Sequence, residues 1–170
     1  RSAIALQIMI DTYSLDATVA DLVRETDELF PDILRTQLAP MPGLIELLAA
    51  LEEQKIPKGI ATSSRRSFVE QVLGYFDYQP RFDPILTSES IMHGKPHPEI
   101  YLLAAQRLGI SPGEMLVLED SHNGCRAAMA AGAIAVAVPA GHSRQHDFTG
   151  ATLIANSLAD ERLYQLLGIK

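Results

Sequence analysis

Short apolar runs alternate with helical segments of roughly ten residues over most of this sequence, and no other feature constrains its fold as strongly. Strand-like runs lie at residues 58–62, 84–87, 115–118 and 134–138, with helical patterns at 44–55, 64–75, 98–108 and 123–131. Apolar runs without polar alternation are typical of strands that are covered on both faces. Strands that alternate with helices predict βαβ units. The expected fold class is therefore α/β, with a Rossmann-like parallel sheet.

Residues 1–40 carry a helical pattern and no strand-like run. Apolar side chains recur at helical spacing between charged ones, which is typical of an amphipathic helix. Asp16 is the expected N-cap of this helix, and Pro31 is expected to kink or divide it. The breaker-rich segment 38–43 is the predicted hinge to an α/β core at 41–170, whose last helix we expect Ser157 to cap.

The bulk properties exclude several classes of protein. The 170 residues have a formal net charge of -7, and an acidic balance disfavours a nucleic-acid partner. The longest uncharged stretch, 127–141, is shorter than the roughly 20 residues of a membrane span. Cys125 is the only cysteine, so no intramolecular disulfide can form and a reducing, cytoplasmic location is expected.

Ligands of parallel sheets bind beyond the carboxyl ends of the strands, so the residues that follow each predicted strand are the candidates for function. Thr62, Ser63 and Ser64 follow the first strand-like run. Hydroxyls and free N–H groups at a helix start can hold a phosphate. However, Ser and Thr are also the commonest helix caps, and these three residues by themselves favour capping.

Lys95 follows the second strand, in the stiff segment Gly-Lys-Pro-His-Pro. An ammonium that is held in a fixed position can bind a phosphate or offset developing negative charge. The alternative is that Lys95 is exposed to solvent, as most lysines are.

Glu119 and Asp120 follow the apolar strand 115–118 directly. Adjacent carboxylates at the mouth of a sheet repel each other unless a cation lies between them, and Mg²⁺ prefers such oxygen ligands. The alternative is that Asp120 or Ser121 caps the next helix. From the residues alone, the two interpretations stand equal.

Together, the three motifs resemble the haloacid dehalogenase superfamily, and within it the group of beta-phosphoglucomutase and the phosphoglycolate-type phosphatases. The matching residues are Thr62, Lys95 with Pro96 and Pro98, and Glu119, Asp120 and Ser121 with Gly124. The match covers about residues 42–139. Residues 1–40 resemble the last part of the helical cap that these enzymes insert.

The resemblance implies an enzyme of phosphoryl transfer that uses Mg²⁺ as its cofactor. By this resemblance, Thr62 and the N–H of Ser63 hold the phosphoryl oxygens. Lys95 bridges the substrate phosphate and the nucleophilic carboxylate. Asp120, together with Glu119, holds Mg²⁺ directly or through water. Lys95 and Thr62 are thus the candidate catalytic residues, and Thr62, Ser63 and Lys95 bind the phosphate.

The family's first motif, Asp-x-Asp on the central strand, occurs nowhere in the chain. Its first Asp is the family's nucleophile. The chain also opens at Arg1, without Met, directly into an apolar pattern. We therefore expect a fragment, with a gap between the strand ending at Thr62 and strand 115–118, because the missing strand would be buried between them. The 170 residues alone are expected to be inactive and poorly folded.

The function that this interpretation favours is hydrolysis of a small phosphomonoester, of the sugar-phosphate or phosphoglycolate type, through an aspartyl phosphate whose Asp lies outside this chain. One alternative is a beta-phosphoglucomutase-like mutase, and another is a catalytically dead scaffold or binding protein. A dehalogenase is disfavoured because those relatives need no metal. The expected partner is a small phosphorylated metabolite, with no nucleic acid and no membrane, and the protein is expected to be a monomer.

The other polar residues near these motifs have simpler interpretations. Arg65 and Arg66 favour solvated positions in a first helical turn over contact with a second anionic group. His97 and His122 lack a sequence pattern typical of zinc sites. Cys125 is interpreted as a packing residue, because no partner that would activate a nucleophile is evident.

Overall fold

The computed structural model describes residues 2–169, apart from the side chains at positions 2, 3, 5 and 142; Arg1 and Lys170, the outer ends of the two predicted parts, lie outside the described residues. The helices are α1 (Ser2–Tyr13), α2 (Val19–Thr36), α3 (Leu44–Glu53), α4 (Arg66–Tyr75), α5 (Glu99–Leu108), α6 (His122–Ala130) and α7 (Glu161–Leu166). The strands are β1 (Ile60–Ala61), β2 (Ile85–Leu86), β3 (Leu116–Glu119), β4 (Ile134–Ala137) and β5 (Leu153–Ile154). The predicted α/β class is confirmed.

The strands form two sheets, and every pairing between strands is parallel. β1 pairs with β2 in one sheet, with Ile60 opposite Ile85. The other sheet has the order β3-β4-β5, with Leu116 opposite Ile134. The sequence analysis did not predict β5, an edge strand of only two residues.

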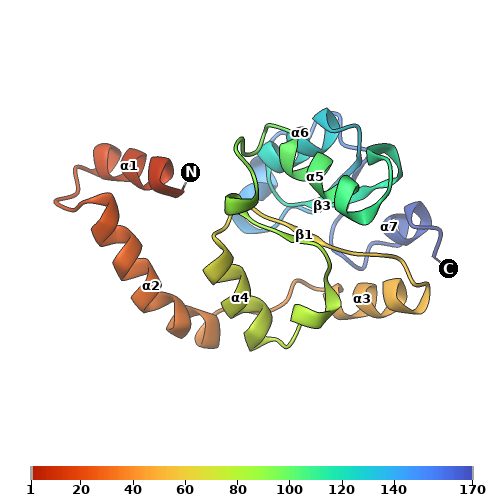
Figure 1. The fold of residues 1–170 in the computed structure, drawn as a ribbon, viewed down its shortest axis with the longest axis horizontal. Helices are drawn as coiled ribbons and strands as arrows, with labels where there is room; N and C mark the ends of the chain where they lie inside the picture. The colour runs from red at the N-terminus through yellow and green to blue at the C-terminus, as the bar shows by residue number, and fades with distance from the viewer. Residues whose placement is uncertain (1, 170) are drawn as a thin grey trace.

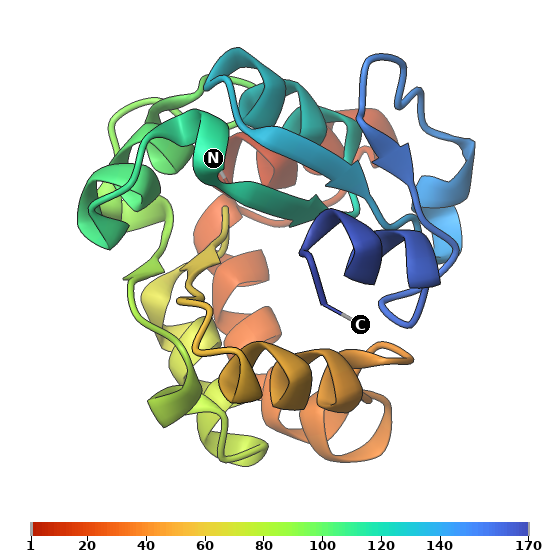
Figure 2. The same ribbon diagram turned by 90° about the vertical axis from the view of Figure 1, so that its right-hand side faces the viewer.

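The two sheets do not pair with each other through any described residue, and an apolar cavity of about 390 Å³ lies between β1 and β3. Its wall includes Ile60 and Ala61 from one side, residues 115–118 from the other, and leucines of α3. Figure 2 shows the β1 strand lying apart from the sheet that contains β3. The expected gap between these strands is therefore present.

The larger sheet is covered on both faces, which explains why its strands are apolar throughout. Val117 and Ala135 pack with buried residues of α5 and α6, whereas Val136 and Val138 pack with Leu163 and other residues of α3 and α7. Successive strand residues thus point to opposite helical layers. This double covering fixes the direction in which each strand end faces.

Helices α1 and α2 extend to one side of the α/β body (Figure 1). α2 contacts α4 through an edge-to-face pair of Phe30 and Phe68, whose ring centroids lie 4.4 Å apart. An ion pair of 2.5 Å joins Asp27 to Arg65 beside it. The assignment of residues 1–40 to part of a helical cap stays a prediction.

Two sequence expectations about helix caps were wrong. Thr18 caps α2 in place of Asp16, because its hydroxyl accepts the N–H of Asp21 in a capping box. Pro31 lies inside α2 and does not divide it, and a kink at Pro31 stays a prediction. At the other end of the chain, Asp160 caps α7 in place of Ser157, accepting the N–H of Arg162.

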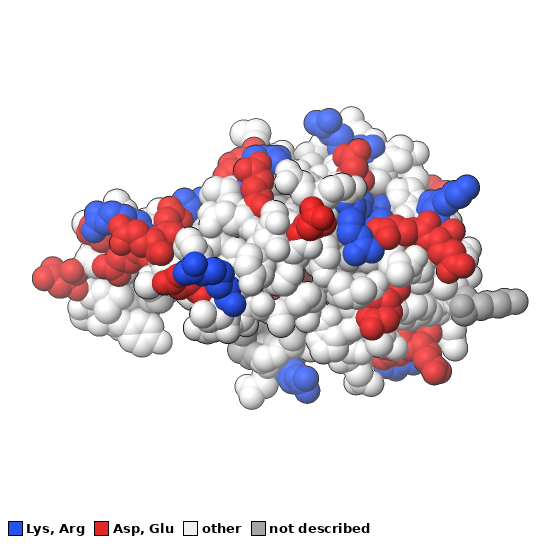
Figure 3. Space-filling view, turned by 90° about the horizontal axis from the view of Figure 1, so that it is seen from below, with Lys and Arg blue, Asp and Glu red and all other residues white. Residues whose placement is uncertain are grey.

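None of the described helices combines the length and apolar character needed to cross a membrane. On the face drawn in Figure 3, acidic and basic side chains are interspersed over the surface.

Candidate functional site

The residues that follow β1 and β3 line one cleft. Its volume is about 290 Å³, and Thr62, Ser63, Lys95, Glu119 and Asp120 all contribute to its wall. A second, more open hollow of about 510 Å³ shares Ser63 and Lys95 with it. The structure therefore brings together every residue that the sequence singled out for phosphate or metal binding.

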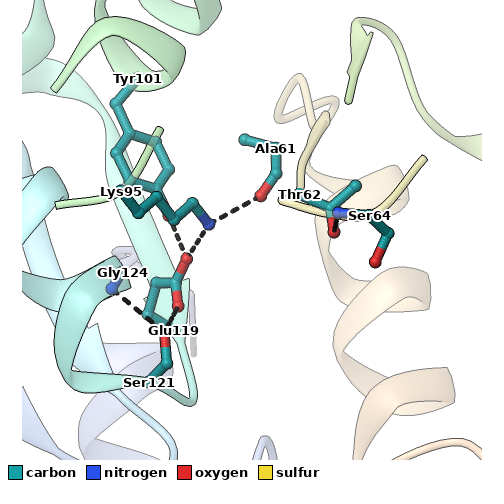
Figure 4. Close-up of polar contacts among 8 residues, drawn as sticks. All are labelled: Ala61, Thr62, Ser64, Lys95, Tyr101, Glu119, Ser121 and Gly124. Carbon is teal, nitrogen blue, oxygen red and sulfur yellow. Dashed lines mark hydrogen bonds and ion pairs between the residues drawn. The ribbon is translucent and has the colours of Figure 1, made fainter. Parts of the chain in front are cut away.

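Lys95 is buried at the base of this cleft. Its side chain is only 9% exposed, which excludes the interpretation as a solvated lysine. The ammonium donates to the carbonyl of Ala61 at 3.0 Å and pairs with Oε1 of Glu119 (Figure 4). It also lies 4.9 Å from the ring centroid of Tyr101, a cation–π contact.

Glu119 is buried below the cleft, and both of its carboxylate oxygens accept hydrogen bonds. The Oε1 atom accepts from Lys95 and from the hydroxyl of Tyr101, and Oε2 accepts from Ser121 Oγ at 3.0 Å. Burial and the adjacent Glu119 charge raise the pKa of Tyr101, so that its hydroxyl stays protonated and donates. A Cβ at Gly124 would overlap the Glu119 carboxylate, so glycine at that position makes room for it.

Asp120 differs from Glu119 in its exposure and in its hydrogen bonding. It is exposed, and none of the described residues hydrogen-bonds or pairs with its carboxylate. Ser121 is the N-cap of α6, its hydroxyl accepting the N–H of Gly124 at 3.1 Å. Because capping belongs to Ser121, the Asp120 carboxylate stays available to a ligand in the cleft.

The hydroxyl turn after β1 does not cap α4 directly. Thr62 Oγ1 accepts the N–H of Ser64 at 3.1 Å, while the N-cap of α4 is Arg65, without a side-chain hydrogen bond. The preference for helix capping at Thr62, Ser63 and Ser64 was therefore wrong in this detail. Ser63 is exposed on the wall of both hollows.

The loop that carries Lys95 is fastened by the first turn of α5. The carboxylate of Glu99 accepts the backbone N–H groups of Met92 and His93, each at 2.7 Å. These bonds, with the Met92 contribution the largest, lower the pKa of Glu99 to about 2. The loop thus enters the cleft with a fixed backbone.

The remaining polar candidates have structural partners. Arg65 pairs with Asp27, and the backbone N–H of Arg66 donates to Glu89 at 3.0 Å. Cys125 is buried, and burial together with the nearby carboxylates raises the pKa of its thiol to about 11. Arg65 is thus held in an ion pair and is not simply solvated, whereas the half-exposed side chain of Arg66 and the burial of Cys125 agree with their sequence interpretations.

The sequence analysis did not identify Tyr101 as part of the site, although its hydroxyl donates a hydrogen bond to Glu119. Tyr101 lies in the first half of α5, two residues beyond Glu99, and is 3% exposed. An aromatic residue at helical spacing indicates core packing. Only the fold shows that its hydroxyl reaches a carboxylate from a strand eighteen positions away.

A model of the family described as haloacid dehalogenase-like hydrolases matches residues 4–138. The chain belongs to this family. This membership agrees with the parallel sheets and with the placement of the three motifs at the strand ends.

Two curated relatives and one solved structure illustrate the likeness. The chain is 33% identical over 160 residues to a bifunctional riboflavin kinase/FMN phosphatase of Arabidopsis thaliana, covering 94% of this chain and 42% of that protein. It is 36% identical over 129 residues to hexitol phosphatase B of Escherichia coli O157:H7, covering 75% of this chain and 58% of the relative. A mutant of CbbY from Rhodobacter sphaeroides in complex with xylulose-(1,5)bisphosphate has a TM-score of 0.77 at 31% identity, over 85% of this chain and 66% of that one. The chain thus spans about half the length of the two curated relatives.

Proposed function

We propose that this chain supplies most of the catalytic core of a phosphatase that hydrolyses a small phosphomonoester with the help of Mg²⁺. The observation that carries the proposal is the buried Lys95 ammonium, held by Glu119 and Ala61 in a cleft that Thr62, Ser63 and Asp120 also line. The names of two relatives, an FMN phosphatase and a hexitol phosphatase, support the same reaction and a phosphorylated small molecule as substrate.

Lys95 has the donors that binding a phosphate requires. An ammonium carries three N–H bonds. Two of them are directed at the Ala61 carbonyl and at Glu119, and one remains for a ligand in the cleft. Because Glu119 and the carbonyl fix the ammonium in place, it needs no reorganisation to stabilise negative charge on a phosphoryl group.

Thr62 and Ser63 supply the neutral donors. The hydroxyl of Thr62 accepts the N–H of Ser64, which leaves its own hydrogen to donate to a phosphoryl oxygen. Ser63 adds its backbone N–H and hydroxyl on the wall of the same cleft. In this proposal, Thr62, Ser63 and Lys95 surround the phosphoryl oxygens from two sides.

The two acidic residues have different roles in this proposal: Asp120 binds the cation, and Glu119 holds Lys95. Magnesium is commonly bound by one or two carboxylates together with water and substrate phosphate. Asp120, exposed and without a hydrogen bond from the described residues, fits as the direct ligand. Glu119 has both oxygens engaged, so in this proposal it positions Lys95 and reaches the cation only through water. When bound, Mg²⁺ neutralises phosphate charge and orients the group for in-line attack.

The nucleophile lies outside these 170 residues in this proposal, since no Asp-x-Asp occurs among them. A strand seated in the cavity between β1 and β3 would end at the same edge as Thr62 and Glu119. A carboxylate at the end of that strand would face a phosphate held by Lys95 and Thr62. Its attack on phosphorus would break the P–O bond to the substrate alcohol, which would leave with a proton from the second Asp of the motif. Water would then hydrolyse the aspartyl phosphate to inorganic phosphate and regenerate the carboxylate.

The test is phosphate release by the intact protein from p-nitrophenyl phosphate and from a panel of hexitol phosphates, sugar bisphosphates and FMN. We expect turnover that EDTA abolishes and added Mg²⁺ restores. Asp120→Asn is expected to lose about a hundredfold or more in kcat, on the scale of one electrostatic group in a site. Asp77→Asn is the matched control, because Asp77 is exposed, does not line the cleft and has a left-handed conformation that Asn tolerates. Full turnover in excess EDTA, or full turnover by Asp120→Asn, would overturn the proposal.

A further inference from the structure

Two imidazoles and one carboxylate converge in the loop before α5, outside the cleft. One ligand atom from each of His93, His97 and Glu99 lies within 4.8 Å of the other two. His93 Nδ1 is 2.8 Å from Glu99 Oε2, and His97 Nδ1 is 3.9 Å from the same oxygen. Within the described part of the chain, no other three histidine, cysteine or acidic side chains meet in this way.

The spacing of these atoms suits a shared ion. Metal–ligand bonds of about 2.0–2.1 Å in a tetrahedral site hold the ligand atoms about 3.4 Å apart. The two distances from Glu99 Oε2 lie on either side of this value. The two imidazole rings are exposed, with centroids 4.6 Å apart, so rotation of their side chains can adjust the positions of their nitrogen atoms.

The donor set selects the kind of ion. Two imidazole nitrogens with one carboxylate oxygen suit the borderline transition ions, whereas Mg²⁺ prefers oxygen ligands alone. We propose that His93, His97 and Glu99 bind a divalent transition-metal ion, of which Zn²⁺ is the representative, at a site separate from the acidic pair. Three protein ligands leave one position for water.

Glu99 is already held in the position that this site requires. Its carboxylate accepts the N–H groups of Met92 and His93, so it enters the site on a fixed backbone. Such hydrogen bonds to a ligand carboxylate are typical of metal sites. The ion would replace the hydrogen bond between His93 Nδ1 and Glu99, and also the 3.3 Å hydrogen bond that His97 Nδ1 accepts from the N–H of Glu99.

The position of the site links it to Lys95. His93 and His97 flank this lysine in the sequence, two residues away on either side. An ion bound to both imidazoles therefore fastens the two ends of the segment that delivers the ammonium to Glu119. Because a ligand that binds only the folded state stabilises it, Zn²⁺ is expected to raise the melting temperature.

The test is a Zn²⁺ titration of the intact protein in saturating Mg²⁺, followed by calorimetry, with Co²⁺ absorption as a second readout. We expect one Zn²⁺ per chain. His93→Ala and His97→Ala should each weaken Zn²⁺ binding by at least about tenfold. Loss of a residue that only hydrogen-bonds to a metal ligand already has an effect of this size. The double variant should also lose the visible Co²⁺ bands of a site with nitrogen ligands. Glu99→Gln, which keeps an acceptor for the Met92 N–H, should weaken binding as well.

His146→Ala and Asp120→Asn are the controls, because they change an imidazole elsewhere and the carboxylate of the cleft. Both should bind Zn²⁺ with wild-type affinity. Melting curves in EDTA, alike for the wild type and both imidazole variants, would show that the fold is intact. Unchanged Zn²⁺ affinity in either imidazole variant, or loss of binding in Asp120→Asn, overturns the proposal. These measurements need no phosphatase activity, so the site and the proposed reaction can fail separately.

Discussion

The ammonium of Lys95 joins the two sheets of the molecule, since it pairs with Glu119 at the end of β3 and donates to the carbonyl of Ala61 at the end of β1. The side chains of the ion pair are only 9% and 7% exposed. The polar link lies at the edge where the cleft opens, above the apolar cavity that separates the same two strands. One side chain thus serves both the fold and the candidate site.

Removing either partner of this pair is expected to destabilise the protein strongly. Glu119→Gln leaves a buried ammonium without its counter-charge, and breaking a buried pair costs about 3–5 kcal/mol. Lys95→Met leaves the Glu119 carboxylate with only its hydroxyl donors, Tyr101 and Ser121. The measurement is urea unfolding of the intact protein, as wild type, as each single variant and as the double variant.

The double variant separates the pair from simple side-chain loss. We expect Lys95→Met/Glu119→Gln to be more stable than the sum of the single changes predicts, because neither charge is then left unpaired. Strict additivity of the two single effects would contradict the buried pair. Phosphatase activity should be lost in all three variants, since each removes or releases the ammonium.

Gly124→Ala is expected to displace Glu119 and so to impair both stability and activity. A Cβ at this position overlaps the Glu119 carboxylate, although alanine is the better helix former. Gly74→Ala is the matched control. It lies in α4 with no atom within 4 Å of the added methyl, and it is expected to gain about 0.5–1 kcal/mol. Equal effects of the two substitutions on kcat would argue against the packing described for Glu119.

Acid is expected to weaken the link between α3 and the segment before β2. Glu52 accepts two hydrogen bonds of 2.8 Å from Arg81 and pairs with Lys58 at 3.0 Å. These contacts, the bonds from Arg81 first, lower the pKa of Glu52 to about 2. Because the folded pKa lies below the unfolded value, this contribution is present above about pH 4.3 and is lost as the pH falls toward 2.

The comparison is between the wild type and Glu52→Gln of the intact protein, in urea unfolding at a series of pH values. The wild type should be the more stable of the two near neutral pH, and the difference should shrink with acidification and with added salt. A difference that stays constant down to about pH 2 would show that Glu52 acts through packing and not through its charge.

The grouping of the candidate site was predictable from the sequence, because parallel strands end at the same edge of a sheet. This rule joins Thr62, Lys95 and Asp120, which lie far apart in the chain but line one cleft. The gap beside β1 was predicted on a separate ground, because the sequence contains no Asp-x-Asp motif. The roles of the individual side chains stay predictions.

The sequence could not distinguish Glu119 from Asp120, because two adjacent acids carry no sign of which one is buried. The difference comes from strand pleating, which turns Glu119 inward toward Tyr101 and leaves Asp120 exposed. The convergence of His93 with Glu99 was hidden too, because it depends on the loop folding back onto the first turn of α5. The prediction of Asp16 as an N-cap was wrong for a simpler reason. Several polar residues lie close to the start of α2, and any of them could accept the free N–H groups of its first turn.

The last prediction concerns the 170 residues without any further segment. Among the described strands, β1 and β3 each pair on one side only, and their other edges face an apolar cavity. Seating one strand between them needs about 9.6 Å, twice the usual spacing, and would satisfy both edges. We expect the isolated chain to bind the dye ANS, to unfold without a sharp transition and to release no phosphate from p-nitrophenyl phosphate.

A longer protein that supplies an apolar strand ending in Asp-x-Asp should lose the dye binding and gain turnover. Replacing the first Asp of that strand by Asn should abolish the turnover and leave the fold intact. A sharply cooperative and active 170-residue chain would instead mean that the cavity needs no strand and that the nucleophile is among the residues already present.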